Sequence, residues 1–128
     1  MADLLQSDPR LGRIVDVLQD KKALDITLMD LRDLSDAADF FVLCTGNSDQ
    51  QVRTLAQEVR DKLKAEGHPP WHVEGLDTRR WVLIDYADLV VHVFRREARE
   101  FYALERLWGD AEIQRVEESW DVSPLPLG

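Results

Sequence analysis

The fold is predicted from one stretch of the sequence, residues 81–94, which reads Trp81-Val82-Leu83-Ile84-Asp85-Tyr86-Ala87-Asp88-Leu89-Val90-Val91-His92-Val93-Phe94. Its two runs, Trp81–Tyr86 and Leu89–Phe94, are rich in β-branched and aromatic residues, which favour strands. Only Ala87 and Asp88 separate the runs, so the connection must be a tight turn. This pattern predicts an antiparallel hairpin.

A helix is predicted directly after the hairpin. The apolar residues Phe101, Leu104 and Trp108 recur at intervals of three and four, which places them on one side of a helix. The sequence Gly109-Asp110-Ala111 ends that helix. The hairpin also carries a Trp at its start and acids at Asp85 and Asp88. Trp81 is therefore either a core anchor beside a solvated turn or a binding residue, because Trp is mostly buried but is enriched at interfaces.

Two further helices are predicted upstream of the hairpin. The first covers about residues 8–22, with Asp8 as its N-cap and Pro9 at the first helical position. The second begins at Ser48, which forms a capping box with Gln51, and ends at Gly67.

Three strands complete the prediction. Residues 25–31 alternate between apolar and polar, which is typical of a half-buried or edge strand. Residues 40–44 are apolar on both faces, as in a central strand covered by helices. A short strand at 71–74 follows the second helix, so strand, helix and strand form a unit with parallel strands.

The sequence therefore predicts an α/β protein, with a single-domain mixed β-sheet of about five strands flanked by helices in residues 1–111. Residues 112–128 form an acidic tail without sustained periodicity, which is typical of a mobile segment, and Trp120 is its candidate contact with the body.

Composition narrows the functional classes. In 128 residues no apolar run approaches a membrane span, and the N-terminus has no signal-peptide pattern, so we predict no membrane association and a cytoplasmic location. The single cysteine, Cys44, is predicted to be a buried, inert thiol. A net charge of −9 disfavours nucleic acid and favours a basic protein partner. A local basic patch remains an alternative, because six arginines lie in or beside residues 80–108: Arg79, Arg80, Arg95, Arg96, Arg99 and Arg106. Interleaved acids make a salt-bridged, solvated face the favoured interpretation.

No catalytic motif emerges from the residues. Gly46-Asn47-Ser48 precedes a helix, as in a phosphate cradle, but it lacks a P-loop lysine. His72 and Glu74 share a strand face with no complete ligand set, so we predict no metal and no cofactor. The chain is interpreted as a binding module without an active site. The alternative is a divergent metal-dependent nucleotidyltransferase that uses Gly46, Ser48 and Asp85.

The order of several motifs resembles the ribosomal silencing factor family (RsfS, also called Iojap) from about Ala23 to Ala111. The matching segments are Ala38-Asp39-Phe40-Phe41-Val42, Cys44-Thr45-Gly46-Asn47-Ser48, Val73-Glu74-Gly75, residues 81–86, residues 88–94 and residues 101–110. The resemblance implies a nucleotidyltransferase-like topology without the catalytic acids. It also implies binding to the large ribosomal subunit through ribosomal protein fourteen, which blocks joining of the small subunit and represses translation in starvation.

The same resemblance implies a homodimer in the free state and a set of partner-binding residues. These are Trp81, Leu83, Asp85, Asp88 and His92, with Tyr102, Leu104 and Trp108 as second choices that are also core candidates. Where the family usually has Gly in the hairpin turn, this chain has Ala87, so either the turn type differs or strain is tolerated. A homodimeric scaffold and a minor contact of Arg95, Arg96 or Arg99 with ribosomal RNA remain open alternatives.

Overall fold

The hairpin predicted from residues 81–94 is present at the middle of a larger sheet. In the computed structural model, which describes residues 3–117, β4 covers Trp81–Asp85 and β5 covers Leu89–Arg95. The two strands are antiparallel, with Trp81 opposite Phe94 and Leu83 opposite His92.

The sheet is mixed, as predicted, but it has six strands rather than about five. Their order is β3-β4-β5-β2-β1-β6, and only β2 and β5 are parallel neighbours. The remaining strands are β1 (Leu24–Asp30), β2 (Phe40–Gly46), β3 (His72–Glu74) and β6 (Glu112–Arg115). The predicted parallel orientation of β3 and β2 follows from this order, although β4 and β5 lie between them.

β6 lies in the segment predicted as a tail, so the folded body extends beyond Ala111. It pairs antiparallel with β1, and Thr27 lies opposite Arg115. β1 is consequently an interior strand with buried residues on both faces, not a half-buried or edge strand. The sequence pattern missed β6 because the pairing, not a long apolar run, stabilises so short a strand. The predicted contact of Trp120 lies outside the described residues.

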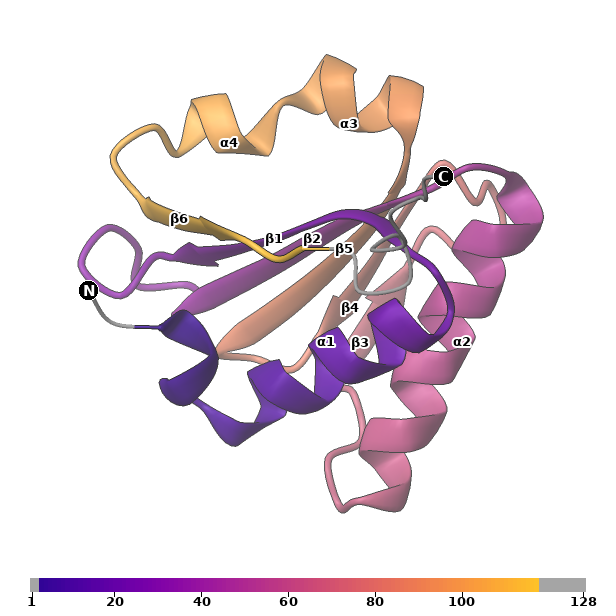
Figure 1. Ribbon diagram of the computed structural model, residues 1–128, viewed down its shortest axis with the longest axis horizontal. Helices are drawn as coiled ribbons and strands as arrows, with labels where there is room; N and C mark the ends of the chain where they lie inside the picture. The colour runs from indigo at the N-terminus through magenta and orange to yellow at the C-terminus, as the bar shows by residue number, and fades with distance from the viewer. Residues whose placement is uncertain (1–2, 118–128) are drawn as a thin grey trace, which may run out of the picture.

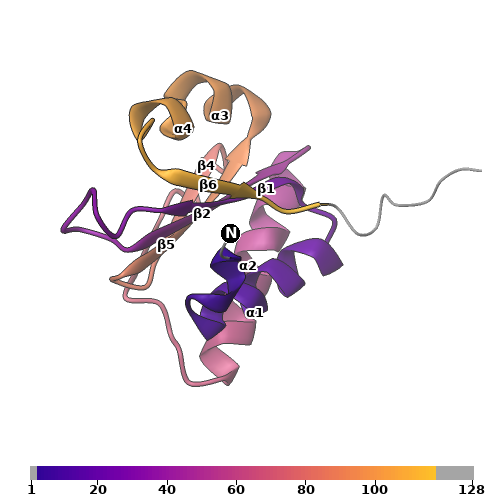
Figure 2. The same cartoon turned by 60° about the vertical axis from the view of Figure 1, so that its left-hand side comes forward.

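Two N-capped helices cover one face of the sheet (Figures 1 and 2). They are α1 (Pro9–Asp20) and α2 (Asp49–Ala65), and a 3-10 turn, η1 (Leu4–Gln6), precedes them. Both predicted N-caps are confirmed: Asp8 accepts a hydrogen bond from Arg10 N, and Ser48 accepts one from Gln51 N. The larger core lies between these helices and the sheet, and it includes Cys44, which is fully buried. Burial raises the pKa of the Cys44 thiol to about 12, as expected for an inert thiol.

The opposite face carries two short helices where one was predicted. These are α3 (Arg96–Tyr102) and α4 (Leu104–Leu107), and the chain bends between them at Ala103, which has φ 47°. The bend allows Glu105 to accept a hydrogen bond from the buried Arg99 guanidinium, which also donates to Thr27 of the sheet. The single-helix prediction failed because these tertiary contacts outweigh local helix propensity. As a result Leu104 is buried, while Phe101 is 79% exposed instead of packing in the core.

No helix in residues 3–117 is long and apolar enough to cross a membrane.

Candidate protein-binding surface

Strand alternation divides the side chains of β4 between the two faces of the sheet. Val82 and Ile84 belong to the larger core beside α1 and α2, whereas Trp81, Leu83 and Asp85 are only half-buried. The buried sheet residues of the small core under α3 and α4 come from β1, β2 and β5, and Trp81 of β4 packs against the edge of this core, so Leu83 and Asp85 remain only half-buried on the same face. We call this surface the open face. Its residues are Trp81, Leu83 and Asp85, joined through aromatic contacts by Phe41, Tyr102 and Trp108.

The indole of Trp81 is held in place from several sides. Its Nε1 donates a hydrogen bond to His92 Nδ1 over 3.0 Å. Its ring stacks on Phe94, with 5.1 Å between centroids, and Tyr102 of α3 lies at 4.5 Å. Trp81 nevertheless remains half-buried, so it presents a rigid aromatic surface that loses little conformational freedom on binding.

His92 supports this surface from below rather than forming part of it. Its side chain is only 3% exposed, and burial lowers its pKa to about 3, so the imidazole is neutral at physiological pH. Because Nδ1 accepts a hydrogen bond from the indole N–H of Trp81, the proton of the neutral imidazole lies on Nε2. That buried atom has no hydrogen-bond partner within residues 3–117. The structure thus places His92 as a residue that positions Trp81.

The two predicted acids of the hairpin lie in different surroundings. Asp85 stays on the open face, where its Oδ1 accepts a hydrogen bond from Ala87 N over 2.7 Å. Asp88 is exposed, and its carboxylate accepts hydrogen bonds from Arg10 of α1, which belongs to the other layer. Asp88 is therefore not grouped with the aromatic residues.

Between these acids Ala87 adopts φ 76°, and a hydrogen bond from Asp88 N to Tyr86 O closes the turn. A turn of this kind with positive φ is strained for a residue other than glycine. The sequence left open whether Ala87 changes the turn type or the turn tolerates strain, and the positive φ of Ala87 shows that strain is tolerated.

The three predicted residues of the last helices also separate. Tyr102 is 48% exposed and contacts Trp81. Trp108 joins the open face through Phe41, with which it forms an edge-on contact at 6.3 Å. Leu104 is a core residue beside Met29 and Leu43, so it has no place on the surface.

Sequence reasoning missed two aromatic residues near this surface. Phe41 packs edge-on against His92 with 4.4 Å between ring centroids. It was hidden because residues 40–44 are apolar on both faces, a pattern that does not reveal which face is left partly open. Phe101 extends the surface beyond Tyr102, at 5.1 Å between centroids. Phe101 is exposed because the helix breaks at Ala103. The sequence did not indicate this break, because alanine is a strong helix former.

The nucleotidyltransferase alternative needs Gly46, Ser48 and Asp85 in one site, and the sheet separates them. Asp85 is on β4 and Gly46 is on β2, and β5 lies between these strands. Asp85 is opposite Val90 near one end of β5, whereas Gly46 is beside Arg95 at the other end. Five residues of strand between these positions correspond to about 16 Å. The Asn47 amide that a phosphate would contact already donates to Gln51 Oε1. These residues therefore do not assemble one active site.

The candidate metal ligands His72 and Glu74 lie on β3. His72 Nε2 lies 2.6 Å from Glu74 Oε2, so the two side chains contact each other on the surface. In the part of the chain that the structure describes, no group of three potential ligands surrounds a common point.

Comparison with known proteins gives a consistent family. The model of the family described as "Ribosomal silencing factor during starvation" matches residues 5–125. The ribosomal silencing factor RsfS of Bacillus subtilis is 47% identical over 94 residues, covering 73% of this chain and 80% of that protein. RsfS of Halalkalibacterium halodurans is 42% identical over 103 residues, covering 80% and 88%. A crystal structure of a Chromobacterium violaceum protein is similar with a TM-score of 0.77 at 33% identity, covering 85% of this chain and 91% of that one.

Proposed function

Since the chain belongs to the family of ribosomal silencing factors, we propose that it binds the large ribosomal subunit through ribosomal protein fourteen. Occupancy of that protein sterically blocks joining of the small subunit, and translation falls in starvation. No bond is made or broken in this mechanism. The site of action is the cytoplasm, where the subunits join.

The observation that carries the proposal is the restrained, half-buried Trp81 at the edge of the small core, beside the half-buried Leu83 and Asp85 of the same strand. Binding energy at interfaces concentrates in a few aromatic residues that sit in rigid, well-packed surroundings. Trp81 meets this description because His92, Phe94 and Tyr102 restrain its ring. Leu83 lies beside it as an apolar neighbour on the same face.

Charge supports a basic partner. The chain carries a net charge of −9, and the acidic residues Glu74 and Asp85 flank Leu83 on the open face, because Glu74 lies opposite Leu83 on the neighbouring strand. An acidic surface steers a basic protein toward contact and raises the association rate.

The same face also serves the free protein in this proposal. Exposed aromatic side chains at Phe101 and Tyr102 favour pairing of two copies when no ribosome is present. The homodimer and the ribosome then compete, so a variant that does not dimerise binds large subunits more tightly. Any contact with ribosomal RNA falls mainly to Arg96, because Arg99 is buried and Arg95 pairs closely with Asp49, whereas the more exposed Arg96 lies 3.6 Å from Asp25.

Co-sedimentation with purified large subunits, small subunits and intact ribosomes tests the proposal. We expect binding to the large subunit only, weakened about 30-fold by Trp81→Ala, since an aromatic hot spot contributes about 2 kcal/mol or more. Trp71→Ala is the matched control, because Trp71 is 78% exposed and lies outside the contacts of Trp81. Its affinity should be unchanged.

Trp81 also borders the small core, so thermal melting must show that the Trp81→Ala variant is folded. Leu83→Glu is the second variant, because its half-buried side chain can be replaced with less disturbance of the core. Folded variants that bind large subunits with undiminished affinity would refute the assigned face.

A further inference from the structure

The two parallel strands of the sheet, β2 and β5, are followed by helices on opposite faces of the sheet. β2 continues into α2 on one face, whereas β5, its parallel neighbour, continues into α3 on the other face (Figure 1). The chain therefore diverges at the carboxyl ends of these strands and leaves a crevice there. Open α/β sheets bind ligands at this position.

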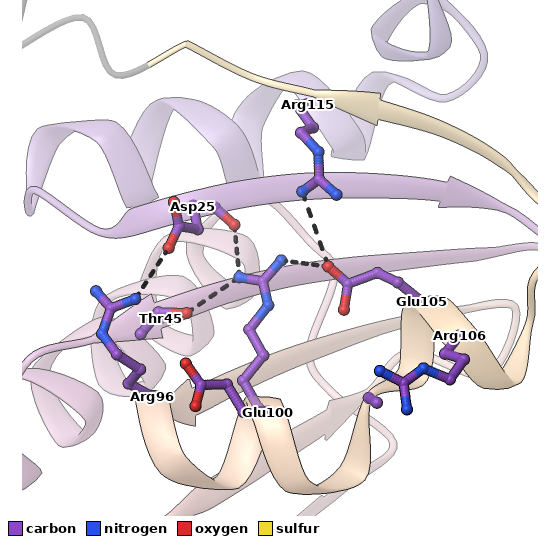
Figure 3. Close-up of a pocket in the computed structure, with 9 residues that line it drawn as sticks. Asp25, Thr45, Arg96, Glu100, Glu105, Arg106 and Arg115 are labelled. Atoms are coloured by element: carbon purple, nitrogen blue, oxygen red, sulfur yellow. Dashed lines mark hydrogen bonds and ion pairs between the residues drawn. The ribbon is translucent and has the colours of Figure 1, made fainter.

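A cavity of about 400 Å³ lies at this point, between the strand ends and the α3–α4 layer. Figure 3 shows side chains from both β1 and β2 of the sheet, from α3 and α4, and from β6 around it. It lies within the usual size range of small-molecule sites. Its charged lining residues are Arg96, Arg99, Arg106 and Arg115 with Asp25, Glu100 and Glu105.

Arg99 forms a fixed cationic wall of the cavity. Its guanidinium donates hydrogen bonds to Asp25 O over 2.6 Å, to Thr45 Oγ1 over 3.0 Å and to Thr27 Oγ1 over 2.9 Å, and it pairs with Glu105 at 2.8 Å. The N–H groups of both terminal nitrogens are therefore already used within the protein. These contacts hold the planar group in one orientation, so Arg99 shapes the cavity and adds a fixed positive charge, while the donors that a ligand can reach come from the other arginines of the lining.

The other three arginines are more loosely held. Arg96 lies 3.6 Å from Asp25, and Arg115 lies 3.8 Å from Glu105. Arg106 forms no ion pair with any residue in the range 3–117. These guanidinium groups can therefore turn toward an incoming anion without breaking a short ion pair.

We propose that this cavity binds a small phosphorylated ligand with at least two phosphate groups, such as a nucleoside diphosphate. A guanidinium group can bind two oxygens of a phosphate group at once, and a phosphate group carries more negative charge than a carboxylate. The four arginines outnumber the three carboxylates of the lining, and the three that are not fully engaged, Arg96, Arg106 and Arg115, exceed what one phosphate group needs. The cavity is also larger than a lone phosphate requires.

This site is separate from the open face, since none of its lining residues belongs to that surface. The inference is therefore tested apart from the proposed protein contact of the open face, although Arg96 is also the residue proposed for a minor contact with ribosomal RNA. A backbone phosphate of RNA offers the same chemistry, but a concave pocket suits a compact ligand better than a continuous strand.

Isothermal titration calorimetry with the full chain tests the proposal, using pyrophosphate, ADP, adenosine and a short single-stranded RNA as probes. We expect ADP and pyrophosphate to bind and adenosine to give no heat. The double variant Arg96→Gln/Arg106→Gln should bind ADP about tenfold more weakly or worse, because two charge-assisted contacts are lost.

The matched control is Arg53→Gln/Lys62→Gln, which removes the same charge from exposed positions of α2. Its ADP affinity should be unchanged, and melting curves should show that both double variants are folded. Absence of heat from both ADP and pyrophosphate, equal binding of adenosine, or equal ADP affinity in the cavity variant would each overturn the proposal. Binding of RNA without binding of either small phosphate would overturn it as well.

Discussion

At the residue scale, Trp81 depends on a neighbour that the sequence alone does not reveal. The hairpin register places His92 of β5 opposite Leu83 of β4. Leu83 is two residues after Trp81, so Trp81 and His92 lie on the same face of the sheet, where His92 reaches the indole. The hydrogen bond to Trp81 and the burial of His92 together require a neutral imidazole. The binding surface is therefore coupled to the protonation of a residue beneath it.

This coupling predicts a pH dependence of stability. The pKa of His92 is lowered to about 3 in the folded state, and a histidine in an unfolded chain titrates near its ordinary value of about 6.5. The unfolded state therefore takes up a proton first, so stability is full above pH 6.5 and is lost as the pH falls toward 3. Between pH 7 and pH 5 this costs about 2 kcal/mol.

Urea unfolding of the wild type and of His92→Asn at both pH values measures the effect. The variant should lack this loss, because asparagine does not titrate, whereas His72→Asn, at an exposed histidine, should retain it. An equal loss in the wild type and His92→Asn would show that His92 is protonated in the folded state.

Ala87 offers a second prediction at the same scale. Its φ of 76° is strained for alanine by about 1 to 2 kcal/mol, and glycine would relieve that strain at some cost in unfolded-chain entropy. Ala87→Gly should therefore raise the free energy of unfolding by about 0.5 to 1 kcal/mol. Urea denaturation measures it, with Ala65→Gly at the end of α2 as a control of opposite sign. Destabilisation by both substitutions would contradict the positive φ.

At the scale of elements, local signals predicted most of the fold. The hairpin, the two N-caps and the central strand all follow from residues close together in the sequence, and each is present. The α3–α4 bend and β6 could not be predicted in this way. Each depends on a distant partner: Arg99 reaches Thr27 and Thr45 in the sheet, and β6 pairs along β1.

The candidate surface shows the same division. Trp81, Leu83 and Asp85 could be placed on one face from strand alternation alone. The separation of Asp88 and Leu104 from that face could not, because it depends on Arg10 of α1 and on the bend at Ala103.

β6 leads to a prediction about truncation. Its Gln114 side chain accepts a hydrogen bond from Leu4 N and donates one to Asp3, so β6 fastens the start of the described chain as well as covering β1. Ending the protein at Ala111 should lower the free energy of unfolding by about 2 kcal/mol or more, since several net hydrogen bonds of about 1 kcal/mol each are lost.

Urea unfolding and size-exclusion chromatography compare this truncation with one that ends at Glu117, which keeps every contact described for β6. We expect association of the shorter protein as well, because the edge of β1 is left unpaired. Equal stability of the two truncations would show that β6 contributes nothing to the fold.

At the scale of the whole molecule, the charge is distributed unevenly. The chain carries −9 overall, yet four arginines converge on the cavity at the carboxyl ends of β2 and β5. The open face instead combines an aromatic centre with acids at Glu74 and Asp85. Two surfaces of different chemistry thus lie on one small sheet, one suited to a basic protein and the other to an anion.

The acidic rim and the aromatic centre should govern different steps of ribosome binding. Charges at a rim act mainly on the association rate through long-range steering, whereas a desolvated anchor acts mainly on dissociation. Glu74→Lys should therefore slow association with immobilised large subunits several-fold at low salt. This difference should vanish near about 0.5 M salt, where the screening length falls to a few ångströms. Trp81→Ala should instead accelerate dissociation at every salt concentration.

Biolayer interferometry separates the two rates, and Asp61→Lys on the exposed side of α2 gives the same change in net charge away from the open face. If steering depends on the rim, Asp61→Lys will slow association less than Glu74→Lys. Equal slowing by both would mean that only the total charge matters, and the acids of the open face would then have no special place in recognition.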